Sequence, residues 1–261
     1  REHTSAKHTR THERKAHMTA HRWADLRTSM AQPIGSRPLP ELLVLNAPPL
    51  VVLSRLQVAP GEARLRLGES TPLHLAVEEG CDHVIVQAIL ALNNAAVAKP
   101  NDDGQLPLHL AASHGAGERV VAALLAAHQD AAACPDEDGR LPLHYAAEHG
   151  AAIGPFLRIL RAYPEAVACR DEAHGRLPLH LAALHGAPSA VVATLLLAHR
   201  AGVHARDHEG HTALDLTARA AAPRRGVRAA LVAASEPAMG SAASAPALVR
   251  WSPSEEEEEE E

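Results

Sequence analysis

Histidine is the residue whose number and spacing first suggest chemistry in this chain. The sequence holds 19 histidines, and three pairs in its central part are spaced by five residues: His109/His114, His144/His149 and His180/His185. Neutral imidazole is a common ligand for zinc and copper. The zinc-protease pattern H-E-x-x-H, however, places its two histidines four residues apart on one helical face. The five-residue spacing therefore does not indicate a metal site.

A second group of histidines lies in the Thr- and Arg-rich segment at the start of the sequence: His3, His8, His12, His17 and His21. Such runs can bind zinc or copper, and the alternative is a low-complexity tail without metal. Their spacings of 5, 4, 5 and 4 residues do not keep the rings on one helical face, and no Cys accompanies them. This pattern favours the low-complexity tail, which we expect to be disordered.

The remaining motifs do not match a common catalytic class. The stretch Gly115-Ala116-Gly117 begins like G-x-G-x-x-G, but Val120 stands where the third Gly belongs, and no strand precedes it. Neither a phosphate-binding loop nor a G-x-S-x-G elbow nor a kinase-like set occurs. We therefore expect no enzyme activity, no cofactor and no bound metal.

The cysteines and the charge limit the classes of binding partner and the cellular compartments that the sequence favours. Cys81, Cys134 and Cys169 form no C-x-x-C pair, and their odd number argues against a disulfide framework, which favours a reducing cytoplasmic or nuclear location. The run Glu255–Glu261 alone exceeds the formal net charge of −6, so the rest of the chain is nearly neutral. Dispersed basic residues and 2% aromatics do not favour nucleic acid. No apolar run reaches the roughly 18 residues that a membrane span needs.

The elements that position the central histidines recur at an almost constant interval. The stretch from Leu141 to Gly150, L-P-L-H-Y-A-A-E-H-G, has close copies that start at Thr71, Leu106 and Leu177, and a weaker copy starts at Thr212. These starts are separated by 35, 35, 36 and 35 residues. A period of this length predicts a solenoid of stacked helical units, each of which contacts only its neighbours.

Local physics predicts two helices in each copy. Thr71 can cap the first helix, and Pro72 occupies the position where a missing N–H costs nothing. A glycine ends each first helix, at Gly80, Gly115, Gly150 and Gly186, and glycine-containing turns join the units at 101–104, 136–139, 171–175 and 207–210. Apolar stripes predict the second helices at Val84, Ile85, Ile89, Leu90; Val120, Val121, Leu124, Leu125; Phe156, Leu157, Ile159, Leu160; Val191, Val192, Leu195 and Leu196.

The copies resemble ankyrin repeats, whose T-P-L-H-x-A signature and period of about 33 residues they follow. The resemblance implies an all-α solenoid in which each unit has a β-turn, two antiparallel helices and a loop. It also implies that His74, His109, His144 and His180 form hydrogen bonds to nearby backbone as structural ties.

The predicted domain organisation follows from the extent of the resemblance, which is roughly residues 37–235. The segments are a disordered leader (1–36), a degenerate N-terminal cap (37–70), four repeats (71–105, 106–140, 141–176, 177–211), a degenerate C-terminal cap (212–235) and a disordered acidic tail (236–261).

The sequence departs from the family where Leu106, Leu141 and Leu177 replace the usual Thr before Pro. Loss of a capping hydroxyl costs about 0.5–2 kcal/mol in typical hosts. Either burial of the leucines offsets this loss, or the array of repeats has low stability. From the sequence we expect Leu141→Thr to raise the melting temperature, and a fall would show that the leucine is buried and needed.

The resemblance implies a non-catalytic protein-interaction scaffold whose partner meets the turn tips and the concave face. The residues at these positions are Glu78, Glu79, Asp102, Asp103, Gln105, Ser113, His114, Glu137, Asp138, Arg140, Glu148, His149, Glu172, His174, Arg176, Leu184, His185, His208, Glu209 and His211. Their acidic character predicts a protein partner with a basic surface, bound to a monomer. The alternative is that the repeats recruit substrate for a larger enzyme or channel.

Overall fold

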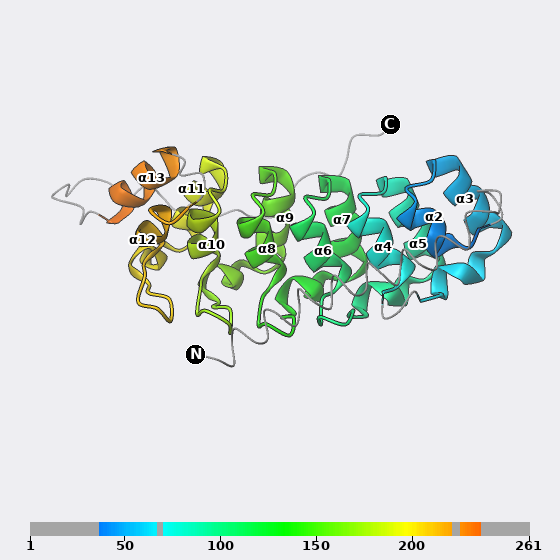
Figure 1. Cartoon of the computed structure of the whole chain (residues 1–261), viewed down its shortest axis with the longest axis horizontal. Coiled ribbons are helices and arrows are strands. Elements are labelled where there is room, and N and C mark those ends of the chain that lie inside the picture. The colour runs from blue at the N-terminus through cyan, green and yellow to red at the C-terminus, as the bar shows by residue number, and fades with distance from the viewer. Residues whose placement is uncertain (1–36, 67–69, 221–224, 236–261) are drawn as a thin grey trace, which may run out of the picture.

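A computed structural model of the chain describes residues 37–66, 70–220 and 225–235. The predicted leader (1–36) and acidic tail (236–261) lie outside these residues. In the described part, helices stack in chain order into an elongated slab (Figure 1). The expectation of an all-α solenoid is therefore confirmed.

Each unit contains a short first helix, a longer second helix and, in most units, a 3-10 helix. The first helices are α2 (Leu39–Val44), α4 (Pro72–Glu78), α6 (Pro107–Ser113), α8 (Pro142–Glu148), α10 (Pro178–Leu184) and α12 (Ala213–Thr217). The second helices are α3 (Pro49–Val58), α5 (His83–Leu92), α7 (Glu118–Ala127), α9 (Ile153–Ala162), α11 (Ser189–Ala198) and α13 (Arg225–Ser235). The 3-10 helices, which the sequence patterns did not predict, are η2 (Pro60–Arg64), η3 (Asn94–Ala98), η4 (Gln129–Ala133), η5 (Pro164–Ala168) and η6 (Arg200–His204).

The first helices begin and end as the local residues predict. The side chain of Thr71 accepts a hydrogen bond from the backbone N–H of His74 at 3.4 Å, which caps α4. At the other end of the helix, Gly80 has φ of 68°, a left-handed conformation that glycine adopts without strain. Gly115, Gly150 and Gly186 repeat this ending with φ between 65° and 66°.

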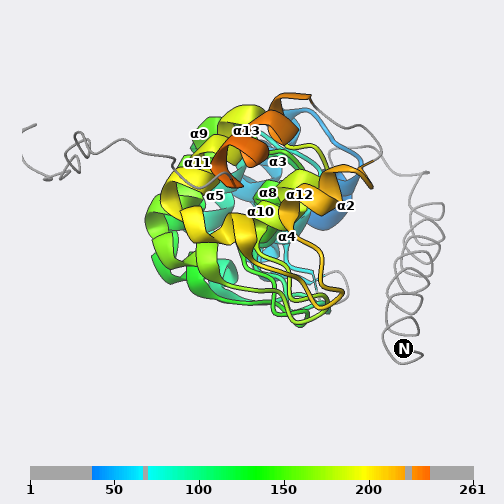
Figure 2. The same cartoon turned by 90° about the vertical axis from the view of Figure 1, so that its left-hand side faces the viewer.

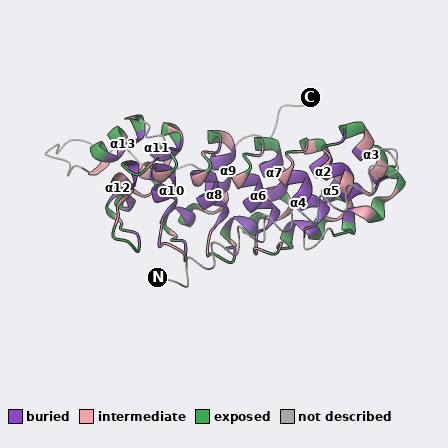
Figure 3. Cartoon of the chain, viewed as in Figure 1, coloured by how far each residue is buried: buried purple, intermediate pink, exposed green. Residues whose placement is uncertain are grey.

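The core lies between two helix layers and between successive units (Figure 3). Seen along the array, first and second helices form separate layers, and the turns project together from one edge (Figure 2). Leu73, Leu108 and Leu143 of the signature are all fully buried, and small alanines beside them allow close packing. One residue of the predicted apolar stripes does not belong to the core. Val84 is 45% exposed, because it lies at the outer start of α5.

The leucines that replace the capping Thr are part of this core. Leu106, Leu141 and Leu177 are 6%, 5% and 2% exposed. In each case, the backbone N–H of the leucine donates to Nδ1 of the histidine three residues later, at 3.0, 3.1 and 3.2 Å. Burial of these leucines therefore offsets the missing hydroxyl, and one backbone donor at each helix start is satisfied by histidine.

The structure reverses the sign expected for Leu141→Thr. The new hydroxyl would stabilise α8 by about 0.5–2 kcal/mol, but truncation of a buried leucine costs about 2–5 kcal/mol. We expect the free energy of unfolding to fall by about 1–2 kcal/mol, measured by urea denaturation. The free energy of unfolding of Leu141→Ala, which adds no hydroxyl, should fall further. A threonine variant as stable as the parent chain would contradict this account.

Candidate partner-binding surface

The turns hold their shape through their own first residue. Asp136 Oδ1 accepts the backbone N–H groups of Asp138 and Arg140 at 3.0 and 2.9 Å. Asn101 and Asp207 make the same pair of bonds in their turns. In the longer turn, Asp171 Oδ1 accepts the N–H groups of His174 and Arg176, each one residue further along. A surface made of such turns is ordered before a partner arrives, which lowers the entropic cost of binding.

Backbone hydrogen bonds join successive turn tips. The N–H of Glu137 donates to the carbonyl of Asp103 at 3.3 Å, and the N–H of Glu172 donates to that of Asp138 at 3.0 Å. The turn at 171–175 contains one additional residue, yet its His174 carbonyl still accepts from His208 N–H at 2.8 Å. The turn tips consequently form one continuous edge along the array (Figure 1).

The four signature histidines are buried ties to the backbone of their own unit, as the resemblance implies. Because Nδ1 of each ring accepts a backbone N–H, its Nε2 carries the proton and donates to a carbonyl further along the chain. The acceptors of His74, His109, His144 and His180 are the carbonyls of Gln105, Arg140, Cys169 and Ala205, at 3.0–3.2 Å. Burial lowers the pKa of His74 to about 4 and also lowers the pKa values of the other three. These rings are therefore neutral structural groups rather than partner contacts.

Most residues predicted for partner binding reach the surface. The exposed ones are Asp102, His114, Glu137, Asp138, His149, Glu172, His185, His208 and Glu209. The partly exposed ones are Glu78, Glu79, Asp103, Ser113, Arg140, Glu148, His174, Arg176, Leu184 and His211.

Gln105 is the exception, and its predicted place on the surface is wrong. It is only 9% exposed, and its Nε2 donates to the hydroxyl of Tyr145 at 2.8 Å. That hydroxyl donates in turn to Asp136 Oδ2 at 2.6 Å. Gln105 immediately precedes the signature, and this position lies beneath the turn of the following unit. Sequence reasoning also missed Tyr145, although it is the one aromatic residue within the signature copies.

Arg140 and Arg176 occupy the same position as Gln105 and also link units. The Arg176 Nε donates to Asp207 Oδ2 at 3.3 Å, while Arg140 Nε lies 3.8 Å from Asp171 Oδ2. Arg140 also forms an ion pair with Glu148 at 2.8 Å and lies over the Tyr145 ring at 5.2 Å. Both arginines consequently have part of their charge neutralised within the array.

Glu148 lies beside the histidines that follow two of the first helices, His149 after α8 and His185 after α10. His185 Nε2 lies 3.4 Å from Glu148 Oε1, and His149 packs edge-on against Tyr145 with ring centroids 6.3 Å apart. Burial is the main cause that lowers the pKa of His149, although nearby Glu148 opposes it. His149, His185, Glu148 and Arg140 therefore form one mixed-charge cluster at the middle of the array.

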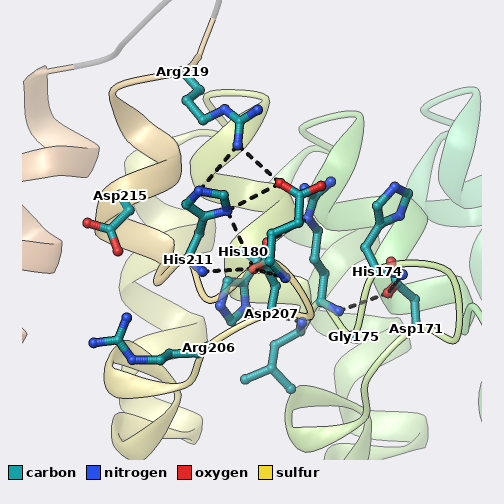
Figure 4. Close-up of polar contacts among 12 residues, drawn as sticks. Asp171, His174, Gly175, His180, Arg206, Asp207, His211, Asp215 and Arg219 are labelled. Atoms are coloured by element: carbon teal, nitrogen blue, oxygen red, sulfur yellow. Dashed lines mark hydrogen bonds and ion pairs between the residues drawn. The ribbon is translucent and has the colours of Figure 1, made fainter. Parts of the chain in front are cut away.

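Charge is distributed unevenly along the array. Residues 70–139 contain ten acidic and two basic residues, whereas residues 176–235 contain three acidic and seven basic ones. The expectation of an acidic surface thus fits the N-terminal half only. There, Asp103, Glu137 and Asp138 make no ion pair with any described residue. In the C-terminal half, Glu209 is 3.2 Å from Arg219 and 3.4 Å from His211 (Figure 4).

Three structural observations bear on metal sites, membrane spans and disulfides. Among the residues that the structure describes, no three His, Cys, Asp or Glu side chains are grouped so as to hold a metal ion. Over the same residues, no helix has the length and apolar character that crossing a bilayer requires. Cys81, Cys134 and Cys169 are all free thiols.

Comparison with protein-family models finds two matches. A family described as ankyrin repeats (3 copies) matches residues 52–134 and 73–160, and a family described as ankyrin repeat matches residues 174–208. Together these ranges cover more than half of the 261 residues. No curated protein matches the chain.

Proposed function

Because the chain belongs to the ankyrin-repeat family, whose repeats form protein–protein interaction modules, we propose that it is a non-catalytic scaffold that binds a protein with a basic surface. The binding surface in this proposal is the turn edge and adjoining concave face of the N-terminal half. The carboxylates of Asp103, Glu137 and Asp138 carry the proposal, because they lie on a preorganised edge without a described ion-pair partner.

The arrangement of the buried polar groups supports a non-catalytic role. A general base needs a ring nitrogen that is free to take a proton from substrate. Both ring nitrogens of His109 and of His144 are bonded to backbone groups. These histidines tie the start of each first helix to the end of the same unit and cannot serve substrate without breaking those bonds.

Charge reversal of the turn edge tests the proposal. We expect Asp103→Lys/Glu137→Lys/Asp138→Lys in the full chain to weaken partner binding by at least about tenfold, because like charges then face each other. The partner would first be captured with the parent chain, then purified and titrated calorimetrically at low and high salt. Binding to the parent chain should weaken as salt rises.

The matched control reverses charge away from the turn edge. Asp130 and Glu165 are exposed on η4 and η5. Asp130→Lys/Glu165→Lys should bind the partner like the parent chain. Equal loss in the control, or binding that does not change in the turn-edge variant, would contradict the proposed surface.

A further inference from the structure

Two arginines stand at equivalent positions of the last two complete turns. Arg170 and Arg206 each immediately precede the turn aspartate, where the earlier units have Pro100 and Pro135. Both arginines are exposed. Arg170 donates to the carbonyls of Gly175 and Arg206, the latter at 2.7 Å, and Arg206 donates to the carbonyl of Gly210 at 2.7 Å. The two guanidinium groups are therefore held in place by neutral acceptors.

The positive charges of this pair are only weakly compensated by neighbouring carboxylates, since Asp215 interacts electrostatically with Arg206 without an ion pair between them. Neither Arg170 nor Arg206 forms an ion pair with a carboxylate in the described part of the chain. Asp215, on α12, lies near Arg206 (Figure 4). Its Oδ2 accepts hydrogen bonds from the backbone N–H and the hydroxyl of Thr212 at 2.9 and 2.8 Å. By contrast, Arg219 lies 3.2 Å from Glu209. The Arg170–Arg206 pair therefore has no ion-pair partner among the described residues.

The chemistry of the pair suits carboxylates. A guanidinium group has five N–H donors in a planar fork that matches a carboxylate, and the backbone bonds of Arg206 use few of them. Two such forks fixed one repeat apart can engage successive acidic side chains of an extended segment. Because both forks are already ordered, binding loses little side-chain entropy.

A strongly acidic segment of the same chain is tethered close to this pair. The segment Glu255–Glu261 follows the last described residue, Ser235, after 19 intervening residues, which can span at most roughly 65 Å. Helix α13, which Ser235 ends, packs against η6, and η6 ends two residues before Arg206. A short tether raises the effective concentration of the segment to about the millimolar range, at which even weak attraction is sufficient.

We propose that Arg170 and Arg206 form a docking surface for Glu255–Glu261 of the same chain. The docked glutamates neutralise the basic half of the array and leave the acidic turn edge of the N-terminal half open. This interaction does not depend on the proposed partner, since the two surfaces lie at opposite halves and have opposite charge.

Trp251 provides a probe, because it lies four residues before Glu255 and the chain has only two tryptophans. In full-length chain carrying Trp23→Phe, we expect the fluorescence anisotropy of Trp251 to fall when Arg170→Gln and Arg206→Gln are introduced together. Glutamine at all seven positions 255–261 should cause the same fall without touching the array. High salt should reproduce it in the parent chain, because it screens exposed charges.

The control removes two exposed arginines from the N-terminal half. Arg64→Gln/Arg119→Gln should leave the anisotropy unchanged. In a second arm, a heptaglutamate peptide is titrated into chain whose own seven glutamates are glutamines. Arg170→Gln/Arg206→Gln should weaken this binding roughly threefold to tenfold, as expected for two exposed ion pairs.

Three results would overturn the proposal. Equal anisotropy in the parent and the Arg170→Gln/Arg206→Gln chain would show that the glutamates do not dock there. An equal fall in the Arg64→Gln/Arg119→Gln control would show nonspecific attraction. A fall that appears only on dilution would assign the contact to a second copy of the chain. Circular dichroism of each variant separates these results from unfolding.

Discussion

Acidification from pH 7.5 to pH 5 should lower the free energy of unfolding by several kcal/mol. Burial depresses the pKa of His74 to about 4, whereas an unfolded histidine titrates near about 6.5. Above pH 6.5 the ring is neutral in both states. Between these values only the unfolded chain binds the proton, so stability is lost as pH falls. His74 alone contributes a loss of about 2 kcal/mol at pH 5.

The other three signature histidines act in the same direction. Burial lowers the pKa values of His109, His144 and His180, and a second proton on any of these rings would remove an acceptor from the start of a first helix. Carboxylates with a lowered pKa, such as Asp207, lose their contribution only below about pH 4. The interval between pH 5 and 7 therefore isolates the histidines.

Urea denaturation at pH 7.5, 6.5, 5.5 and 5 measures this loss. The exposed His114 offers a control, because His114→Gln should keep the acid dependence of the parent chain. Stability that is constant over this interval would mean that the rings are protonated in the folded state, in conflict with the observed hydrogen bonds.

Phe156→Ala should have the second large effect, a loss of about 3–5 kcal/mol. Phe156 is the only phenylalanine, is fully buried, and lies on α9, which packs against α7, α8 and α11. Since each repeat contacts only its neighbours, a cavity in the middle unit weakens the coupling between both halves. We therefore expect unfolding to change from one transition to two.

Circular dichroism during urea denaturation, together with amide hydrogen exchange, would detect the two transitions. Ile153→Ala is the matched control, since Ile153 lies on the same helix but is 40% exposed. It should change stability by about 0.5 kcal/mol or less. A single transition in the Phe156→Ala chain, shifted by less than about 1 kcal/mol, would show that the array unfolds as one unit.

Features set within one unit could be predicted from the sequence. The cap at Thr71, the positive φ of Gly80 and the turn at 136–139 each depend on a few adjacent residues. The all-α solenoid follows from repetition of these signals. The role of His144 needed the family resemblance, because its second bond goes to a carbonyl 25 residues away.

Features set between units could not be predicted in the same way. Gln105 is buried, and its side chain donates a hydrogen bond to the hydroxyl of Tyr145, which lies 40 residues later in the chain. The family resemblance placed Gln105 on the surface with its exposed neighbour Asp102 and its partly exposed neighbour Asp103. The charge polarity was hidden for another reason, since the acidic excess of residues 70–139 is offset in the sum over the chain by the basic residues of 176–235 and of the leader.

The additional residue in the turn at 171–175 shows that the length of a turn in this chain can change. The turn accommodates the insertion locally, and the His174–His208 backbone bond keeps the next unit in register. Length can therefore vary at the edge without altering helix packing, so the turns and the helical scaffold can evolve independently. Loop grafting in this chain would best begin at that turn, where one such change is already tolerated.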